Sequence, residues 1–183
     1  HPRLGIPVHS LYGGSREPDA AALGKLDAVV IDLPDIGARP YTYLWTATLM
    51  MRACAAAGTK VIVLDRPCPI GGARVEGPLL DMAYSSFVGL HPLPMRHGLT
   101  IGEALRMING SCADRCELEI VEMEGWGRGM YFGDTGLPWV LPSPNIPTPE
   151  TALVYPGTVL LEATNISEGR GTTRPFEIIG APW

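Results

Sequence analysis

Two short runs of apolar, mostly β-branched residues mark the first regular elements of the chain. Residues 27–32 (DAVVID) and 60–65 (KVIVLD) share an apolar stretch that closes on an aspartate. Continuous apolar runs of this length are typical of buried strands in a parallel sheet. Between them, residues 43–57 are rich in Leu, Met and Ala and carry one charge, Arg52, before Gly58 offers a left-handed helix stop. The pattern therefore predicts a βαβ unit.

A second helix and a third strand are expected further along. Thr100 is a suitable N-cap, and Glu103 three residues later completes a capping box, so we expect a helix from Thr100 to residues 109–110 (NG). Residues 117–123 (ELEIVEM) alternate between polar and apolar, which predicts an edge or half-exposed strand.

The rest of the chain is dominated by loops that hold most of the prolines and glycines, at residues 66–78, 89–98, 125–147 and 169–183. Five prolines between residues 126 and 149 each remove a backbone donor, so a long loop is expected there. Long ordered loops are usually functional. For residues 151–162 the pattern leaves two alternatives, a helix interrupted near residues 156–157 or a helix followed by a strand.

Composition excludes several classes of function. With 183 residues, 46% of them apolar, the chain can bury a core of its own. The net charge of −5 contains no run of like charges, so we expect no nucleic-acid partner. No stretch is long and apolar enough to predict membrane insertion, and the first residues lack the features of a signal peptide.

The four cysteines are too sparse for a disulfide-rich scaffold. Cys112 and Cys116 have a spacing found among metal ligands, but no second Cys/His pair follows at the distance that a zinc module needs. Packed or surface thiols are the alternative, and we predict no metal site.

Polar residues follow both predicted strands. Asp32 and Asp65 close the strands, and each has an arginine close behind it, Arg39 and Arg66 respectively. Ligands of open parallel sheets bind beyond the carboxyl ends of the strands. Arginine binds carboxylates and aspartate accepts hydrogen bonds from hydroxyl groups, so an anionic, hydroxyl-rich ligand suits this set. The alternative is that these pairs tie loops together at the rim of the sheet.

The densest polar cluster lies at residues 164–174, where two glycines flank Arg170, next to Glu168 and Asn165. Glycines let a backbone approach a ligand closely, although the same residues also make ordinary turns. His97 lies in a Pro/Gly-rich loop, which favours a role in a site over one in a packed core. Aromatic residues such as Tyr41 could stack on a sugar or pack in the core.

A series of short motifs resembles the exo-β-N-acetylmuramidases, a bacterial family of glycoside hydrolases. Each motif is weak alone, but in this order and over the whole length they are specific. The motifs cover residues 7–13 (PVHSLYG), 35–39 (DIGAR), 41–43 (YTY), 64–67 (LDRP), 76–78 (EGP), 86–89 (SFVG), 97–100 (HGLT), 142–145 (PSPN), 155–157 (YPG), 164–172 (TNISEGRGT) and 180–183 (GAPW).

The resemblance implies a Rossmann-like α/β domain, with a mostly parallel sheet and flanking helices, joined to a smaller C-terminal domain. It also implies hydrolysis of terminal β-linked N-acetylmuramic acid in muropeptides or related saccharides, without a cofactor. The resemblance also suggests a secreted, periplasmic or cell-envelope location. We therefore expect residues 1–149 to form part of the Rossmann-like domain and residues 150–183 to form a cleft segment leading to a further domain.

The site residues that these considerations predict fall into two groups. Glu168, Asp35 and His97 are the expected catalytic residues, because glycoside hydrolysis normally needs two carboxyl groups. The expected substrate-binding residues are Asp32, Arg39, Tyr41, Asp65, Arg66, Asn145, Asn165 and Arg170.

The sequence departs from the family pattern in ways that bear on activity. Family members begin earlier, with a Pro-Glu-His-Gly motif whose glutamate is a catalytic candidate, and they continue beyond the last motif. The predicted sheet is therefore incomplete, and we expect the 183-residue chain alone to be inactive. A non-catalytic sugar-binding module is the alternative function. Pro34 and Pro40 also flank the first-loop motif and restrict its backbone.

Overall fold

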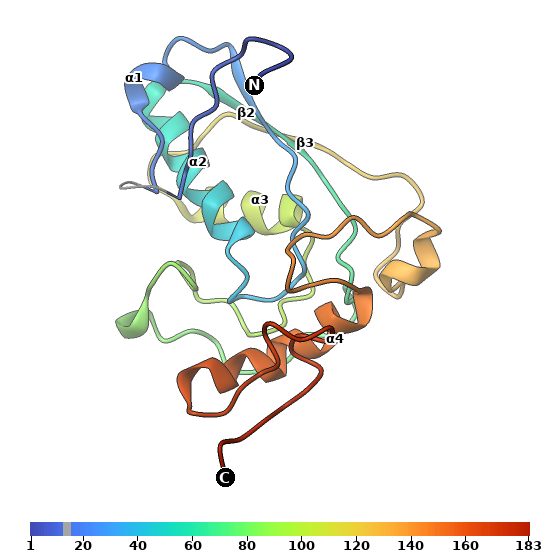
Figure 1. Cartoon of the computed structure of the whole chain (residues 1–183). Coiled ribbons are helices and arrows are strands. Elements are labelled where there is room, and N and C mark those ends of the chain that lie inside the picture. Colours follow the sequence, from blue (N-terminus) through green and yellow to red (C-terminus); the bar gives the residue numbers. More distant parts are fainter. Residues whose placement is uncertain (13–15) are drawn as a thin grey trace.

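A small parallel sheet organises the chain, in a computed structural model that describes residues 1–12 and 16–183. Gly13, which ends the first motif, lies outside the described residues. The sheet has the order β1 (Ala28–Ile31), β2 (Lys60–Leu64) and β3 (Leu118–Val121). Helix α2 (Tyr43–Ala57) connects β1 to β2, and α3 (Ile101–Ser111) lies between β2 and β3 along the chain (Figure 1). The predicted α/β class, with parallel strands and flanking helices, is confirmed.

The helix boundaries follow the predicted signals. Helix α2 ends at Gly58, whose φ of 70° is left-handed and suits a residue without a β-carbon. Helix α3 begins after Thr100, where both hydrogen bonds of the predicted capping box with Glu103 are present. These ends set the positions at which the neighbouring loops leave the helices.

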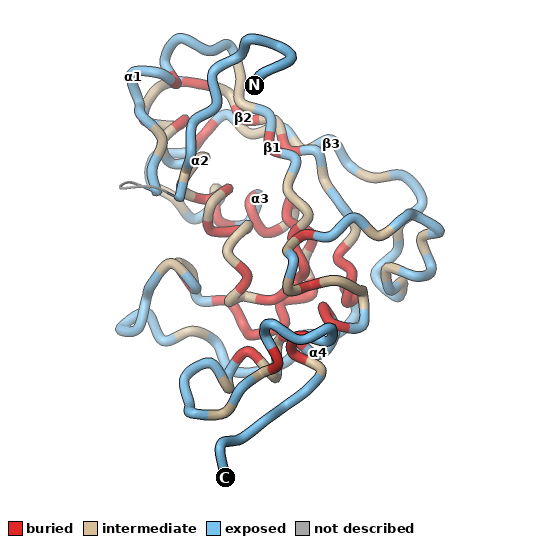
Figure 2. Tube along the Cα trace, viewed as in Figure 1, coloured by how far each residue is buried: buried red, intermediate tan, exposed pale blue. Residues whose placement is uncertain are grey.

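The main core lies between the helices and one face of the sheet. Val61 and Val63 of β2 are fully buried and pack in the same cluster as Trp45 of α2 and Leu105 of α3. The short helix α1 (Ala20–Leu23) adds Leu23 to this cluster. Figure 2 shows buried segments, in red, where α2 and α3 lie next to the strands.

The other face of the sheet corrects one expectation. The first two strands were predicted to be buried, but Val30 of β1 is 58% exposed and Leu64 of β2 is 37% exposed. Val121 of β3 is 47% exposed, as the alternating pattern of that strand predicts. Side chains alternate between the faces of a strand. Because the cluster with α1, α2 and α3 includes the residues of one face only, the alternate residues remain open.

A second core forms beyond the carboxyl ends of the strands. It contains Ile36, Tyr41, Ile70 and the C-terminal residues Tyr155 and Phe176. Figures 1 and 2 show this layer of buried residues between the sheet edge and α4. The loops that carry the candidate residues are therefore held against a packed aromatic cluster.

Residues 151–162 are helical throughout, so neither predicted alternative holds as stated: the helix is not interrupted near residues 156–157, and no strand follows it in this segment. Helix α4 (Pro149–Thr158) contains Pro156 and passes directly into the 3-10 helix η3 (Val159–Ala163). Two further 3-10 turns, η1 (Met82–Tyr84) and η2 (Phe132–Thr135), interrupt the long loops. The predicted loop at residues 126–149 is otherwise irregular.

Among the helices of the described residues, none has the length and apolarity needed to cross a membrane. The four cysteines, Cys54, Cys68, Cys112 and Cys116, are all free thiols. Within residues 1–12 and 16–183, no group of three or more His, Cys, Asp or Glu side chains could hold a metal ion.

Candidate functional site

The two aspartates that close the strands have different surroundings. Asp32, after β1, pairs with Arg66, and its Oδ1 lies 2.5 Å from the guanidinium Nε. The hydrogen bond from Arg66 lowers the pKa of Asp32, which therefore remains ionised. Both side chains are 45% exposed, so this pair lies at the surface of the sheet edge. Arg66, which follows β2, thus contacts the residue that follows β1.

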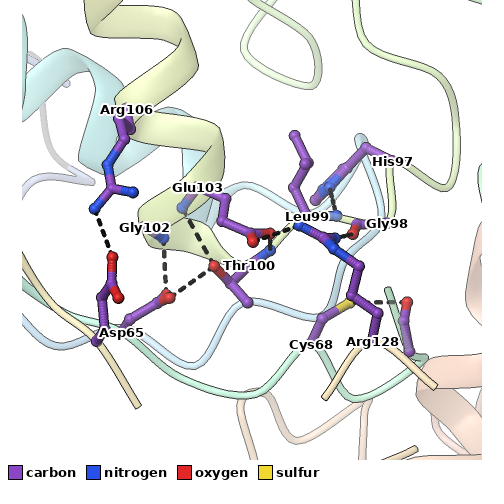
Figure 3. Close-up of polar contacts among 12 residues, drawn as sticks. Asp65, Cys68, His97, Gly98, Leu99, Thr100, Gly102, Glu103, Arg106 and Arg128 are labelled. Atoms are coloured by element: carbon purple, nitrogen blue, oxygen red, sulfur yellow. Dashed lines mark hydrogen bonds and ion pairs between the residues drawn. The ribbon is translucent and has the colours of Figure 1, made fainter. Parts of the chain in front are cut away.

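Asp65, after β2, supports the start of α3. Its Oδ2 accepts a hydrogen bond of 2.7 Å from the Thr100 hydroxyl, and its Oδ1 accepts one of 2.8 Å from the Gly102 amide (Figure 3). The free amide groups at a helix start attract carboxylates. Arg128 donates to Glu103 at 2.5 Å and to the Gly98 carbonyl at 3.0 Å, and so holds the long loop against the same helix end.

Two cavities lie beyond the carboxyl ends of the strands, and Arg66 lines both. The first has a volume of about 220 Å³, and the second about 520 Å³. Asp32 and Asp65 line the second cavity, while Asp35 lines the first. The walls of the first cavity are mainly apolar, formed by Pro34, Pro67, Pro69, Phe132, Leu137, Pro138, Trp139, Val140 and Pro142.

Asp35 is a buried acid at the wall of the smaller cavity. Its Oδ2 accepts a hydrogen bond of 2.9 Å from the Gly37 amide, and its Oδ1 has no hydrogen-bond partner among the described residues. Burial raises the pKa of Asp35 to about 7, because an ionised carboxylate is poorly solvated there, and this outweighs the backbone amides of Gly37 and Leu44, which favour the charged form. Near neutral pH this carboxyl can therefore hold a proton and donate it.

His97 lies beside Asp35 in the interior. The imidazole Nε2 is 4.0 Å from Asp35 Oδ2, and Nδ1 accepts a hydrogen bond of 3.2 Å from the Leu99 amide. Accepting at Nδ1 places the proton of the neutral ring on Nε2, which has no partner among the described residues. Burial lowers the pKa of His97 to about 4, so the ring is neutral at pH 7. Two buried polar groups therefore face each other with unused hydrogen-bonding capacity.

Glu168 belongs to a separate cluster next to the C-terminal helix. Its carboxylate lies 3.0 Å from Arg170 Nε, and a terminal amino group of Arg170 also binds Glu162. The Glu168 carbonyl accepts a 2.6 Å hydrogen bond from the amide of Phe176, which has a φ of 62°. A bulky residue rarely adopts this conformation, and such strain is found most often at functional sites.

Arg39 uses its guanidinium to hold neighbouring loops. It donates to the carbonyls of Pro78 at 2.9 Å and Leu93 at 2.5 Å, and it lines a third cavity of about 420 Å³ together with Glu162. Tyr41 is buried in the second core.

The two asparagines differ in exposure. Asn145 is partly buried, and its backbone amide donates to the Ser143 hydroxyl at 3.2 Å. Asn165 is exposed at the surface.

The predicted site residues thus fall into distinct groups at one end of the fold. Asp35, His97 and Arg66 lie at or next to the first cavity, whereas Glu168 and Arg170 lie by the aromatic core. Tyr155 lies between the two groups. Its ring centroid is 4.7 Å from that of Phe176, and the charges of Asp35 and Arg170 both influence its pKa. That Asp35, Arg39 and His97 face the same cleft as Glu168 stays a prediction.

Sequence reasoning overlooked Glu162 and Phe132. Glu162 shares Arg170 with Glu168, and Phe132 packs edge-on against Trp139 at a ring distance of 4.7 Å. Neither residue belongs to any of the motifs, and no spacing in the sequence sets them apart. Phe132 lies in the turn η2, which the sequence pattern did not predict, and Glu162 lies in η3, at the end of the segment for which the sequence left two alternatives open.

Comparison with known proteins adds independent information. Residues 1–150 match the family model described as the N-terminal part of exo-beta-N-acetylmuramidase NamZ, and residues 153–183 match its C-terminal part. The peptidoglycan beta-N-acetylmuramidase NamZ of Bacillus subtilis (strain 168) is 50% identical over 181 residues, which are 99% of this chain and 44% of that protein.

Two solved structures of DUF1343 family proteins from Bacteroides fragilis NCTC 9343 have the same fold. The first superposes with a TM-score of 0.93 at 42% identity, and the match covers 98% of this chain and 47% of the Bacteroides protein. The second has a TM-score of 0.81 at 37% identity and covers 90% and 46%, respectively. The chain therefore spans less than half the length of these relatives.

Proposed function

The chain belongs to the exo-beta-N-acetylmuramidase NamZ family, and on that premise we propose that the protein is a glycoside hydrolase. The proposed reaction releases terminal β-linked N-acetylmuramic acid from peptidoglycan-derived saccharides. The relative from Bacillus subtilis, a peptidoglycan beta-N-acetylmuramidase by name, supports this assignment at 50% identity.

The observation that carries the proposal is the buried carboxyl of Asp35 at a cavity wall. A glycosidase needs an acid that protonates the departing oxygen, and the pKa of that acid is commonly raised by an apolar environment. Asp35 has a pKa of about 7 for this reason, and its Oδ1 has no hydrogen-bond partner within the described part of the chain. In the proposed mechanism Asp35 is the general acid.

Glu168 is the proposed second carboxylate. Its carboxylate lies 3.0 Å from Arg170 Nε, and glycoside hydrolysis needs a second carboxyl group as a base or nucleophile. His97 is proposed as a positioning residue, because its neutral Nε2–H faces the Asp35 carboxyl. Asp32, Asp65, Arg39, Tyr41, Asn145, Asn165 and Arg170 remain proposed contributors to substrate binding or to its support.

Hydrolysis of a chromogenic β-glycoside of N-acetylmuramic acid by the complete polypeptide tests the proposal. Turnover by the unmodified protein, lost in Asp35→Asn and retained in the exposed control Asp114→Asn, is the expected result. Absence of turnover above the blank would overturn the enzymatic assignment. Saturable sugar binding without turnover would select a non-catalytic binding module instead.

A further inference from the structure

We propose that Arg66 binds the carboxylate of the substrate and thereby selects acidic sugars over neutral ones. The inference rests on the proposed function and deepens it. N-acetylmuramic acid carries a lactyl carboxylate, and arginine is the side chain best suited to bind such a group with two parallel hydrogen bonds. Three arginines were predicted to bind substrate, Arg39, Arg66 and Arg170, and their existing contacts distinguish them.

Arg39 has its terminal nitrogens engaged by the protein itself. Nη1 donates to the carbonyls of Pro78 and Leu93, and Nη2 contacts the sulfur of Met95 at 3.3 Å. These contacts join the first loop to two later segments of the chain. Binding a ligand carboxylate would require Arg39 to leave several of these partners.

Arg170 is already neutralised by two carboxylates. Glu162 binds one of its terminal amino groups, and Glu168 lies 3.0 Å from its Nε. A third carboxylate approaching this cluster would meet more negative than positive charge. Coulomb repulsion therefore opposes the binding of an acidic substituent at Arg170.

Arg66 is the arginine with free donors at a cavity. Its Nε contacts Asp32 Oδ1 at 2.5 Å, while neither terminal amino group has a hydrogen-bond partner within residues 1–12 and 16–183. The contact at Nε fixes the guanidinium on one edge and leaves the edge formed by Nη1 and Nη2 unused. That edge is the fork that matches a carboxylate.

The cavities next to Arg66 suit a sugar with an acidic substituent. The smaller one has Trp139 and several prolines in its wall, which can cover the apolar face of a sugar ring. Asp35 lines the same cavity, and its buried Oδ1 has no hydrogen-bond partner among the described residues. A ring bound there would place a carboxylate substituent within reach of the arginine in the shared wall.

Paired substrates test this assignment in the complete polypeptide. One is a chromogenic β-N-acetylmuramide, and the other is the methyl ester of its lactyl group, which keeps the shape and removes the charge. Arg66→Gln should lower kcat/KM for the acid by about 10- to 100-fold, the scale of a lost charge-assisted hydrogen-bond pair, and leave the ester nearly unaffected. Arg66→Lys keeps the charge but not the paired donors, so its kcat/KM for the acid should lie between those of the wild type and Arg66→Gln. The exposed Arg52 of α2 offers the matched control, Arg52→Gln, with no effect on either substrate.

Equal losses on the acid and the ester would overturn the proposal, because they would give Arg66 a structural role. A selective loss in Arg39→Gln or Arg170→Gln but not in Arg66→Gln would also overturn it. If the unmodified protein turned over neither substrate, the proposed function would fail separately. Calorimetric binding of N-acetylmuramic acid and N-acetylglucosamine would then decide, since Arg66→Gln must weaken only the acid.

Discussion

The imidazole of His97 and the carboxyl of Asp35 face each other at 4.0 Å in the protein interior, and both keep a polar atom without a partner in the described structure. Burial moves the two pKa values in opposite directions, to about 7 for Asp35 and about 4 for His97. Both groups are therefore neutral between these values. A neutral pair can be buried at much lower cost than two separate charges.

The pair predicts two opposing contributions to the pH dependence of stability. The folded pKa of Asp35 is raised, so its contribution is fully present below pH 3.8 and is lost as the pH rises through about 7. The folded pKa of His97 is lowered, so its contribution is present above pH 6.5 and is lost as the pH falls through about 4. Between pH 4 and 6.5 the loss of the Asp35 contribution with rising pH and the gain of the His97 contribution largely cancel.

Substitution of either residue should expose the contribution of the other. In Asp35→Asn, the free energy of unfolding should increase relative to wild type as the pH rises from 4 to 7, by on the order of 2–4 kcal/mol. In His97→Gln, it should decrease over the same range. Urea unfolding at several pH values measures both. Profiles parallel to wild type in both variants would show that these groups titrate normally.

Glu168 should matter for turnover more than for folding. Glu168→Gln in the complete polypeptide removes the charge that pairs with Arg170, and we expect turnover of a β-muramoside to fall by about 100-fold or more. Glu150→Gln, at an exposed position of α4, is the matched control and should retain activity. Wild-type turnover in Glu168→Gln would remove this residue from the catalytic pair.

The start of α3 offers a prediction about stability alone. Thr100 donates to Asp65 and accepts from the Glu103 amide, so Thr100→Ala should lower the free energy of unfolding by about 1–2 kcal/mol. Thr100→Ser keeps the hydroxyl and should remain close to wild type. Chemical denaturation compares the two variants, and equal stabilities would contradict a capping role for the hydroxyl.

Local signals were sufficient to predict the three strands and the helices α2 and α3, but not the short helix α1. The Gly58 helix stop and the Thr100 capping box depend on residues within one turn of each other, and both are present. The parallel strands followed from their apolar runs. The exposure of Val30 could not be predicted in this way, because it depends on which face the helices cover. The sequence shows the pattern of a strand but not the layer that packs on it.

The site was predictable only in part for the same reason. Asp35 and His97 were expected from their motifs, but the two residues are far apart in the sequence, and their proximity depends on tertiary packing. The proximity of an arginine in sequence was a poor guide, since Asp32 pairs with Arg66 and Arg39 binds backbone carbonyls. Glu162 entered the Arg170 cluster without any sequence signal, through the turn that follows α4.

The loop that carries Glu168 depends on two glycines for different reasons, and their substitution separates these reasons. Gly169 has a φ of 85°, and a β-carbon there would lie 2.6 Å from the Ile178 carbonyl oxygen. Gly171 has a similar φ of 82°, but a β-carbon would meet nothing within 4 Å. Gly171→Ala should therefore destabilise by about 1 kcal/mol, the cost of the left-handed backbone alone.

Gly169→Ala adds a steric clash to the same backbone cost and should be clearly more damaging. The Ile178 carbonyl belongs to the segment next to Gly180, which pairs with Ser167, so relief of the clash would shift the backbone on both sides of Glu168. We expect Gly169→Ala to lower both the free energy of unfolding and the turnover, and Gly171→Ala to lower mainly the former. Denaturation and kinetic measurements on the two variants check this difference. Equal effects on turnover would mean that the close packing around Gly169 does not position Glu168.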